Sequence, residues 1–338
     1  MEPTLDVVGV GNAIVDVIVT VPESFIDEHD LVKGAMTLID AERATTLYAA
    51  MPPGIEASGG SAANTAVGVA SLGGSAAYLG KVRNDQLGDV FAHDLRAAGV
   101  AFDVSPALVG DPTARCLIQV TPDAERTMNT FLGISAFLDP ADIDDAVVES
   151  GRITYCEGYL YDTDEAKAAI HHAMDVARAA GRLVSITLSD SFCVDRHRDE
   201  WLDLLADKVD LVFANEAEIG SLFLTDDFEA ASRQITDLVP MAALTRSAKG
   251  SVIVTPDERI EVGASSIERV VDATGAGDLY ASGFLYGLAR GASLAHCAEL
   301  GSIAAGEIIS HIGARRWSVM LRWLSERQDL TVRCRSGS

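Results

Sequence analysis

The sequence predicts an α/β fold with a doubly wound, mostly parallel β-sheet covered by helices on both faces, and a small β-sheet that acts as a lid. The first observation is that from residue 152 apolar runs alternate with segments of helical periodicity, a rhythm typical of parallel sheets. The second is that 338 residues, 48% of them hydrophobic, suffice for one large core with an appendage. We expect strands at 152–156, 183–188, 211–214, 242–245 and 251–255, and helices at 165–180, 198–206, 216–222 and 227–238.

The composition restricts the partners and the compartment. A formal net charge of −24 argues against nucleic acids and anionic membranes as partners. No apolar run approaches the roughly 20 residues that a membrane-spanning helix needs. The five cysteines are scattered without a C-x-x-C pair, which is typical of reduced thiols. We therefore expect a cytoplasmic protein that binds small molecules.

The N-terminal segment predicts a buried strand at 5–9 and a second strand at 13–21. In the second strand Asp16 is a carboxylate amid apolar residues. A buried carboxylate without partners is unfavourable, so Asp16 needs hydrogen-bond donors. Two interpretations stay open: an internal pair, or an acceptor for two vicinal hydroxyls of a ligand.

Residues 22–57 read as a helix near 23–29, a strand at 36–39 and a helix at 41–50, which Pro52, Pro53 and Gly54 end. Next, Gly59 and Gly60 open a helix rich in Ala and Ser. Asn64 lies in its first turn, where its carboxamide could face a ligand. The alternative is that the small residues serve only close helix packing.

The following segment predicts a strand at 76–80, a helix reaching residue 99, and a hairpin at 113–120 and 125–132. We assign residues 15–39 and 112–133 to the lid, and residues 1–14, 40–111 and 134–338 to the large core. Arg126 on the hairpin is either a ligand contact or an exposed arginine.

Two motifs follow strands of the core, at the edge where ligands of such sheets bind. The first is N-E-A-E, from Asn215 to Glu218; its alternative is a capping Asn before a solvated helix start. The second is T-R-S-A-K-G, from Thr245 to Gly250.

The run V-V-D-A-T-G-A-G-D at 270–278 leads into a helix that Gly291 ends. Gly275, Ala276 and Gly277 then lie at a helix N-terminus, where backbone N–H groups and the helix dipole favour a phosphate. Asp278 would repel that phosphate unless it takes a proton from the attacking group. The alternative is a helix start with acidic capping residues.

These motifs resemble the signatures of the ribokinase-like family, the pfkB-type sugar and nucleoside kinases. The resembling segments are D-A-T-G-A-G-D, G-G-S-A-A-N at 59–64, G-N-A-I-V-D at 11–16 and N-E-A-E. The resemblance implies that Asp278 is the catalytic base and that Gly275, Ala276 and Gly277 form the anion hole. It also implies substrate contacts at Asn12, Asp16, Gly59, Gly60 and Asn64, and ATP and magnesium contacts at Asn215, Glu218, Thr245 and Gly250.

The resemblance further implies ATP as the phosphoryl donor and Mg²⁺ held through water by Glu218. A monovalent cation such as K⁺ is common in the family, but the sequence does not decide it. The usual motif is T-x-G-x-x-G where this chain has Ser247. The oligomeric state stays open between monomer and homodimer.

The sequences of several segments, such as K-G-A-M-T-L-I-D and C-E-G-Y-L, resemble those of the adenosine-kinase-like branch of the family. We therefore expect phosphorylation of the 5′-type hydroxyl of a nucleoside, adenosine to AMP in purine salvage. Phe131 and Tyr159 are the candidate purine contacts, since a purine needs apolar or aromatic surface. The alternatives are a kinase for ribose, fructose or a related sugar and, from another class, a non-catalytic regulator that binds sugar or nucleotide.

Overall fold

The computed structural model describes residues 2–123 and 125–310, and its main element is a large sheet. Among these residues that sheet has nine strands in the order β14-β13-β12-β11-β10-β9-β1-β5-β6. The strands from β12 to β6 are parallel, while β13 and β14 are antiparallel. Their bounds are β1 Leu5–Val10, β5 Ala76–Leu79, β6 Val100–Ala101, β9 Gly151–Glu157, β10 Leu183–Thr187, β11 Leu211–Asn215, β12 Met241–Thr245, β13 Ser251–Val254 and β14 Arg259–Val262.

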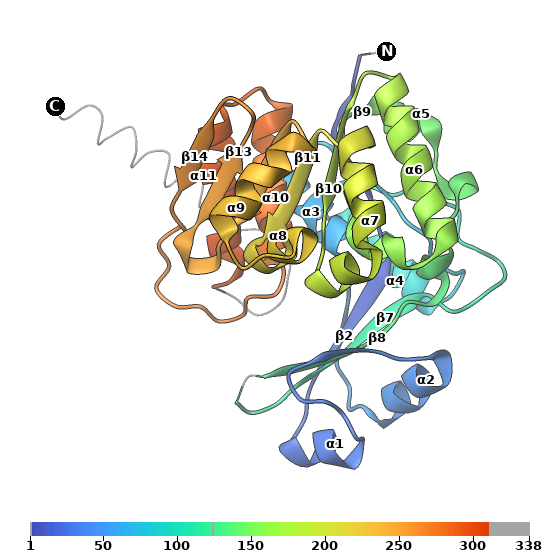
Figure 1. Ribbon diagram of the computed structural model, residues 1–338. Coiled ribbons are helices and arrows are strands. Elements are labelled where there is room, and N and C mark those ends of the chain that lie inside the picture. The colour runs from blue at the N-terminus through green and yellow to red at the C-terminus, as the bar shows by residue number, and fades with distance from the viewer. Residues whose placement is uncertain (1, 124, 311–338) are drawn as a thin grey trace.

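Helices cover both faces of this sheet, because its strands are apolar on both sides. In β1, Val8 and Val10 pack into one core cluster while Val7 packs into the other. Figure 1 shows α6, α7, α8 and α9 on one face. That face carries α5 Asp145–Ser150, α6 Asp164–Ala179, α7 Ser191–Lys208, α8 Glu216–Phe223 and α9 Phe228–Gln234, and the other carries α3 Ser61–Ser71, α4 Gln86–Ala97, α10 Ala276–Ala289 and α11 Leu294–Ile308. The predicted doubly wound α/β fold is confirmed.

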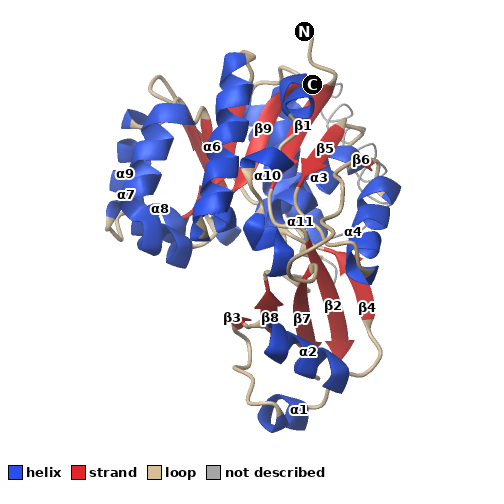
Figure 2. Ribbon diagram, turned by 90° about the vertical axis from the view of Figure 1, so that its right-hand side faces the viewer, coloured by secondary structure: helices blue, strands red, loops and turns tan. Residues whose placement is uncertain are grey.

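A second, smaller sheet lies beyond one end of the large one (Figure 2). Its strand order is β3-β8-β7-β2-β4, with β3 Met36–Leu38, β8 Arg126–Phe131, β7 Ala114–Val120, β2 Ile14–Thr20 and β4 Ile55–Ser58. The helix α1 Glu23–Glu28 belongs to the same region, where its Ile26 packs with Val19 and Val21.

The small unit is larger than the sequence analysis assumed. The strand β4 pairs antiparallel with β2, and α2 Ala41–Ala50 packs on β7 and β8. Residues 41–50 and 55–58 therefore lie with the small sheet, although the sequence analysis assigned them to the core range 40–111. The short pattern I-E-A-S gave no strand signal of its own, and only its pairing with β2 defines it. The remaining domain boundaries stay a prediction.

One helix differs in extent from the prediction. The helix expected at 198–206 is the second part of α7; a first part begins at Ser191, where Asp190 is the cap, and a kink at the non-helical His197 separates the two parts. Within the described part of the chain, no helix combines the length and the apolar character needed to cross a membrane. Residues 311–338, the end of the predicted core range, lie outside the described residues.

Candidate active site

A cavity of about 1100 Å³ lies between the large sheet and the small one. Its walls combine the segments that follow β1, β9, β10 and β11, the start of α3, the start of α10 and the inner face of the small sheet. Most of the predicted site residues line this one cavity. They are Asn12, Asp16, Gly60, Asn64, Tyr159, Asn215, Glu218, Thr245, Gly275, Ala276, Gly277 and Asp278.

Asp278 lies in the first turn of α10, and the first turn of α3 holds its side chain. The Ser61 hydroxyl donates to Asp278 Oδ1 at 2.7 Å, and the Asn64 amide Nδ2 donates to Asp278 Oδ2 at 2.9 Å. The Thr65 hydroxyl donates to the Asp278 backbone carbonyl at 3.1 Å. Two motifs that are 214 residues apart in the sequence therefore meet at one carboxylate. The sequence analysis assigned Asn64 to the substrate and did not foresee this contact.

The turn before α10 has the conformation that its glycines allow. Gly275 has φ 76°, in the left-handed region that favours glycine. Asp272 stabilises the turn, because its Oδ1 accepts from Thr274 N at 2.9 Å. A Cβ placed on Gly277 would meet no atom within 4 Å, so this glycine borders open space. Ala276 N donates to the Ala273 carbonyl at 3.2 Å, which places that N–H inside the turn.

Asp16 faces the cavity from the centre of β2, while Val15 and Val17 on the opposite face are buried. The two glycines before α3 pack close to Asp16 and to Asn12. A Cβ on Gly59 would lie 2.5–2.7 Å from the Asp16 carboxylate, and Gly60 has φ 92° with its α-carbon against the Asn12 carbonyl. A side chain at position 59 would therefore displace the Asp16 carboxylate, and Gly59 does not itself line the cavity.

Asn12 is buried, and protein contacts occupy its amide. Its Nδ2 donates to Glu157 Oε1 at 2.8 Å, and its Oδ1 accepts from the Ser135 hydroxyl at 2.9 Å. Glu157 also accepts from Asn12 N at 2.8 Å and from Ala62 N at 2.9 Å. It thereby fixes both the end of β1 and the start of α3.

The sequence analysis missed Glu157 as a site residue, although C-E-G-Y-L ends a predicted apolar strand with this carboxylate. Burial raises the pKa of Glu157 to about 7, since desolvation of the charged form outweighs its three hydrogen-bond donors, and the Asp278 charge adds to the shift. Glu157 lines the cavity.

On the opposite wall, Asn215 and Glu218 form a reciprocal cap at the start of α8. Asn215 Oδ1 accepts from Glu218 N, and Glu218 Oε2 accepts from Asn215 N, both at 2.9 Å. Both residues line the cavity, so capping and ligand contact are compatible. Burial is the main cause that raises the pKa of Glu218 to about 7; the Asn215 N–H opposes the shift and the nearby Asp190 carboxylate contributes to it.

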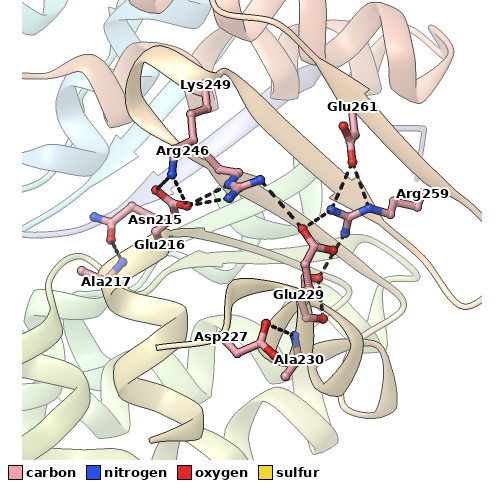
Figure 3. Close-up of polar contacts among 11 residues, drawn as sticks. Asn215, Glu216, Ala217, Asp227, Glu229, Ala230, Arg246, Lys249, Arg259 and Glu261 are labelled. Carbon is pink, nitrogen blue, oxygen red and sulfur yellow. Dashed lines mark hydrogen bonds and ion pairs between the residues drawn. The ribbon is translucent and has the colours of Figure 1, made fainter. Parts of the chain in front are cut away.

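The loop after β12 is held by the ion pairs shown in Figure 3. Arg246 bonds Glu216 at 2.9 Å and lies 3.9 Å from the centre of the Phe228 ring. Ser247, at the position of the family's glycine, adopts φ 51°, the left-handed conformation that a glycine would adopt without strain. Gly250 has φ 90° with its α-carbon against the Val262 carbonyl, and does not line the cavity.

Two predicted substrate residues are directed elsewhere. Arg126 forms an ion pair with Asp272. Phe131 is buried, because Met128 and Thr130 of β8 face the cavity and the alternate side chains face away from it. Phe192, which the sequence analysis did not select because it stands in a polar helix start, lines the cavity with 73% of its surface exposed.

The residues present fit a hydrated Mg²⁺ better than a protein-caged metal. Residues 2–123 and 125–310 contain no group of three or more His, Cys, Asp or Glu side chains arranged to hold a metal ion. Glu218 and Asp190 nevertheless line one wall of the cavity, and a cation between them would relieve the burial of negative charge. Mg²⁺ typically takes one or two carboxylates and keeps several waters.

The pfkB family carbohydrate kinase model matches residues 39–319. The chain belongs to this family. Two solved structures superpose on nearly all of it. A probable sugar kinase protein from Rhizobium etli CFN 42 has a TM-score of 0.90 and 51% sequence identity, and the match covers 97% of this chain and 99% of that one. An adenosine kinase from Sinorhizobium meliloti has a TM-score of 0.89 and 51% sequence identity, and the match covers 96% of this chain and 99% of that one. A 5-dehydro-2-deoxygluconokinase of Geobacillus kaustophilus strain HTA426 is 27% identical over 265 residues, 75% of this chain and 78% of that protein.

Membership in the pfkB family makes this protein a phosphotransferase that acts on a hydroxyl group and uses ATP. The relatives include kinases of both sugars and nucleosides. The family and the predicted ribokinase-like fold are thus confirmed, and the protein is a sugar or nucleoside kinase.

Proposed function

We propose that the protein is a nucleoside kinase that transfers the γ-phosphoryl group of ATP to the 5′-type hydroxyl of adenosine and forms AMP. The observation that carries this proposal is the apolar surface of the cavity that Asp16 and Asp278 also line. It consists of Met36, Leu38, Ile118 and Met128 from the small sheet and Phe192 from the core. A free sugar offers these side chains little apolar area, whereas a purine covers them well.

The acceptor would lie with its vicinal hydroxyls at Asp16 and its primary hydroxyl at Asp278. As the acceptor oxygen bonds to the γ-phosphorus, Asp278 takes the hydroxyl proton. The bond between the γ-phosphorus and the bridging oxygen breaks, and ADP leaves with that electron pair. The N–H groups of Gly275 and Gly277 stabilise the charge on the transferred group. Ala276 joins them only when its bond to Ala273 opens.

On the nucleotide side, Glu218 and Asp190 would hold Mg²⁺ through water, with Asn215 and Thr245 beside the phosphates. When bound, Mg²⁺ neutralises charge on the phosphate oxygens. Asn12, Gly59 and Gly60 shape the substrate wall, and Gly250 shapes the loop after β12. The Tyr159 hydroxyl donates to the Ser189 carbonyl at 3.4 Å, and Tyr159 lines the cavity, where its ring would contact the base.

A sugar kinase is the second candidate, because the 5-dehydro-2-deoxygluconokinase relative spans most of the chain. The discriminating experiment compares kcat/KM for adenosine, guanosine, inosine, ribose, fructose and 5-dehydro-2-deoxygluconate with ATP and Mg²⁺. We expect adenosine to exceed every free sugar. A higher kcat/KM for any of the sugars would reject the nucleoside assignment and leave the kinase assignment intact.

A further inference from the structure

The side chain of Asp278 is held by two donors from a single helix turn. The Ser61 hydroxyl contacts Oδ1 at 2.7 Å and the Asn64 amide contacts Oδ2 at 2.9 Å. Both donors belong to the first turn of α3. The position of that turn is fixed in its own right, because Ala62 N donates to the buried Glu157 at 2.9 Å.

The two helices that carry these groups have a fixed separation. A Cβ on Gly68 of α3 would lie within 2.9 Å of Leu279 and closer still to Ser282, both on α10. The Thr65 hydroxyl also joins α3 to the backbone of Asp278. Because the side chains of Ser282 and Leu279 on α10 pack directly against Gly68 on α3, the two helices lie close together and keep the donors on α3 beside the carboxylate.

We propose that Ser61 is a positioning residue for Asp278: its hydroxyl holds the carboxylate in the orientation that accepts the proton of the attacking hydroxyl. This proposal rests on the proposed role of Asp278 as base. Ser61 has a different task from Asn64, because Asn64 is also a proposed substrate contact. A hydrogen bond to an ionised carboxylate favours the charged form, which is the form that acts as base.

Replacing Ser61 should therefore change turnover and its pH dependence, and leave acceptor binding nearly intact. We expect Ser61→Ala to lower kcat about 10- to 100-fold, the typical effect of losing one hydrogen bond to a charged group. The acidic limb of the kcat–pH profile should move to higher pH, because the carboxylate then protonates more readily. Ser61→Thr retains the hydroxyl and should restore most of the activity.

The matched control is Ser71→Ala, at the other end of the same helix. The Ser71 hydroxyl donates to the Val67 carbonyl at 2.8 Å, away from the cavity. This variant should keep the wild-type kcat and pH profile, and thermal unfolding of both alanine variants reports any loss of folding. A rise in acceptor KM for Ser61→Ala with an unmoved pH profile would overturn the proposal, since Ser61 would then bind substrate directly.

Asp278→Asn, measured in parallel, distinguishes a failure of the proposed role of Ser61 from a failure of the proposed role of Asp278 as base. If Asp278→Asn is inactive and Ser61→Ala has wild-type kcat and pH profile, the role of Ser61 is rejected and the kinase mechanism stands. If Asp278→Asn retains wild-type kcat, the proposed role of Asp278 fails, and the role of Ser61 fails with it.

Discussion

Arg126 on β8 forms an ion pair with Asp272, and this contact joins the small sheet to the loop that precedes α10. The two side chains are only 12% and 8% exposed. The other oxygen of Asp272 accepts from Thr274 N, so one carboxylate connects the small sheet with the turn that begins α10. An arginine that sequence analysis associates with the ligand is thus part of the link between the two units.

Removing one partner of this pair should destabilise the protein, because a largely buried charge loses its counter-ion. Arg126→Met keeps the aliphatic stem and should lower the free energy of unfolding by about 2 kcal/mol or more. Asp272→Asn should have a similar effect. In a denaturation double-mutant cycle the double variant should be about 1–3 kcal/mol more stable than additivity predicts. Strictly additive losses would contradict a direct ion pair.

Phe192 should distinguish nucleosides from sugars. Its ring is exposed at the cavity, so Phe192→Ala removes contact surface without creating a core void. Loss of an aromatic contact to a base is worth about 1–3 kcal/mol, so kcat/KM for adenosine should fall about 5- to 150-fold. Any residual activity with ribose should change little. An equal loss for both acceptors would reject a base contact; Phe137→Ala, another exposed phenylalanine outside the cavity lining, is the control.

Substitutions at Ser247 and Gly250, both in the loop after β12, should change the free energy of unfolding in opposite directions. Ser247 has φ 51°, where a side chain is unfavourable by about 1–2 kcal/mol. Ser247→Gly removes that penalty but raises the entropy of the unfolded chain, so we expect a net gain of about 0.5–1 kcal/mol in unfolding free energy. Gly250→Ala should instead destabilise by more than about 1 kcal/mol, because of its positive φ and the Val262 carbonyl. Chemical denaturation measures both, and a loss on Ser247→Gly would show that the serine side chain is required.

Glu157 should make stability depend on pH in the direction set by its raised pKa. The ordinary pKa of a glutamate is 4.5, and that of Glu157 in the folded protein is about 7. At a pH between these two values, Glu157 of the folded protein keeps a proton that the unfolded chain releases. This stabilisation is complete below about pH 4.5 and is lost as pH rises through 7, an effect on the order of 3 kcal/mol. Denaturation of Glu157→Gln at pH 5 and pH 8 should show a smaller difference than the wild type.

Glu157→Gln should also be less stable overall, because its single amide oxygen cannot accept from both Asn12 and Ala62 and its N–H₂ group cannot accept at all. The exposed Glu165 supplies a control for the loss of one carboxylate, and Glu165→Gln should keep the wild-type pH difference. An unchanged pH difference in Glu157→Gln would show that Glu157 is ionised in the folded protein throughout this range.

Much of this architecture could be predicted from local patterns. The periodicity of residues 152–255 predicts the strands β9 to β13 to within one or two residues, because a sheet buried on both faces needs apolar runs. The glycine-rich turn at 275 predicts the start of α10, since its backbone conformation excludes most other residues. In both cases the residues of the element itself were sufficient to predict it.

The remaining features depend on contacts between distant segments, which one sequence does not display. The pairing of β4 with β2 comes from register across the small sheet and not from its own residues. Asn64 and Ser61 hold Asp278 because α3 and α10 pack closely, and Phe131 faces away from the cavity because of strand alternation fixed at β8. Phe192 carried no sequence signal, since its importance arises only from the cavity beside it.

The role of Asp278 as the base is the central claim, and Asp278→Asn tests it most directly. Asparagine keeps the shape of the side chain and removes its basicity. We expect kcat with adenosine to fall about 10²–10⁴-fold, while ATP binding, measured by calorimetry, and thermal stability stay close to wild type. A variant that retains near-normal kcat would contradict the account.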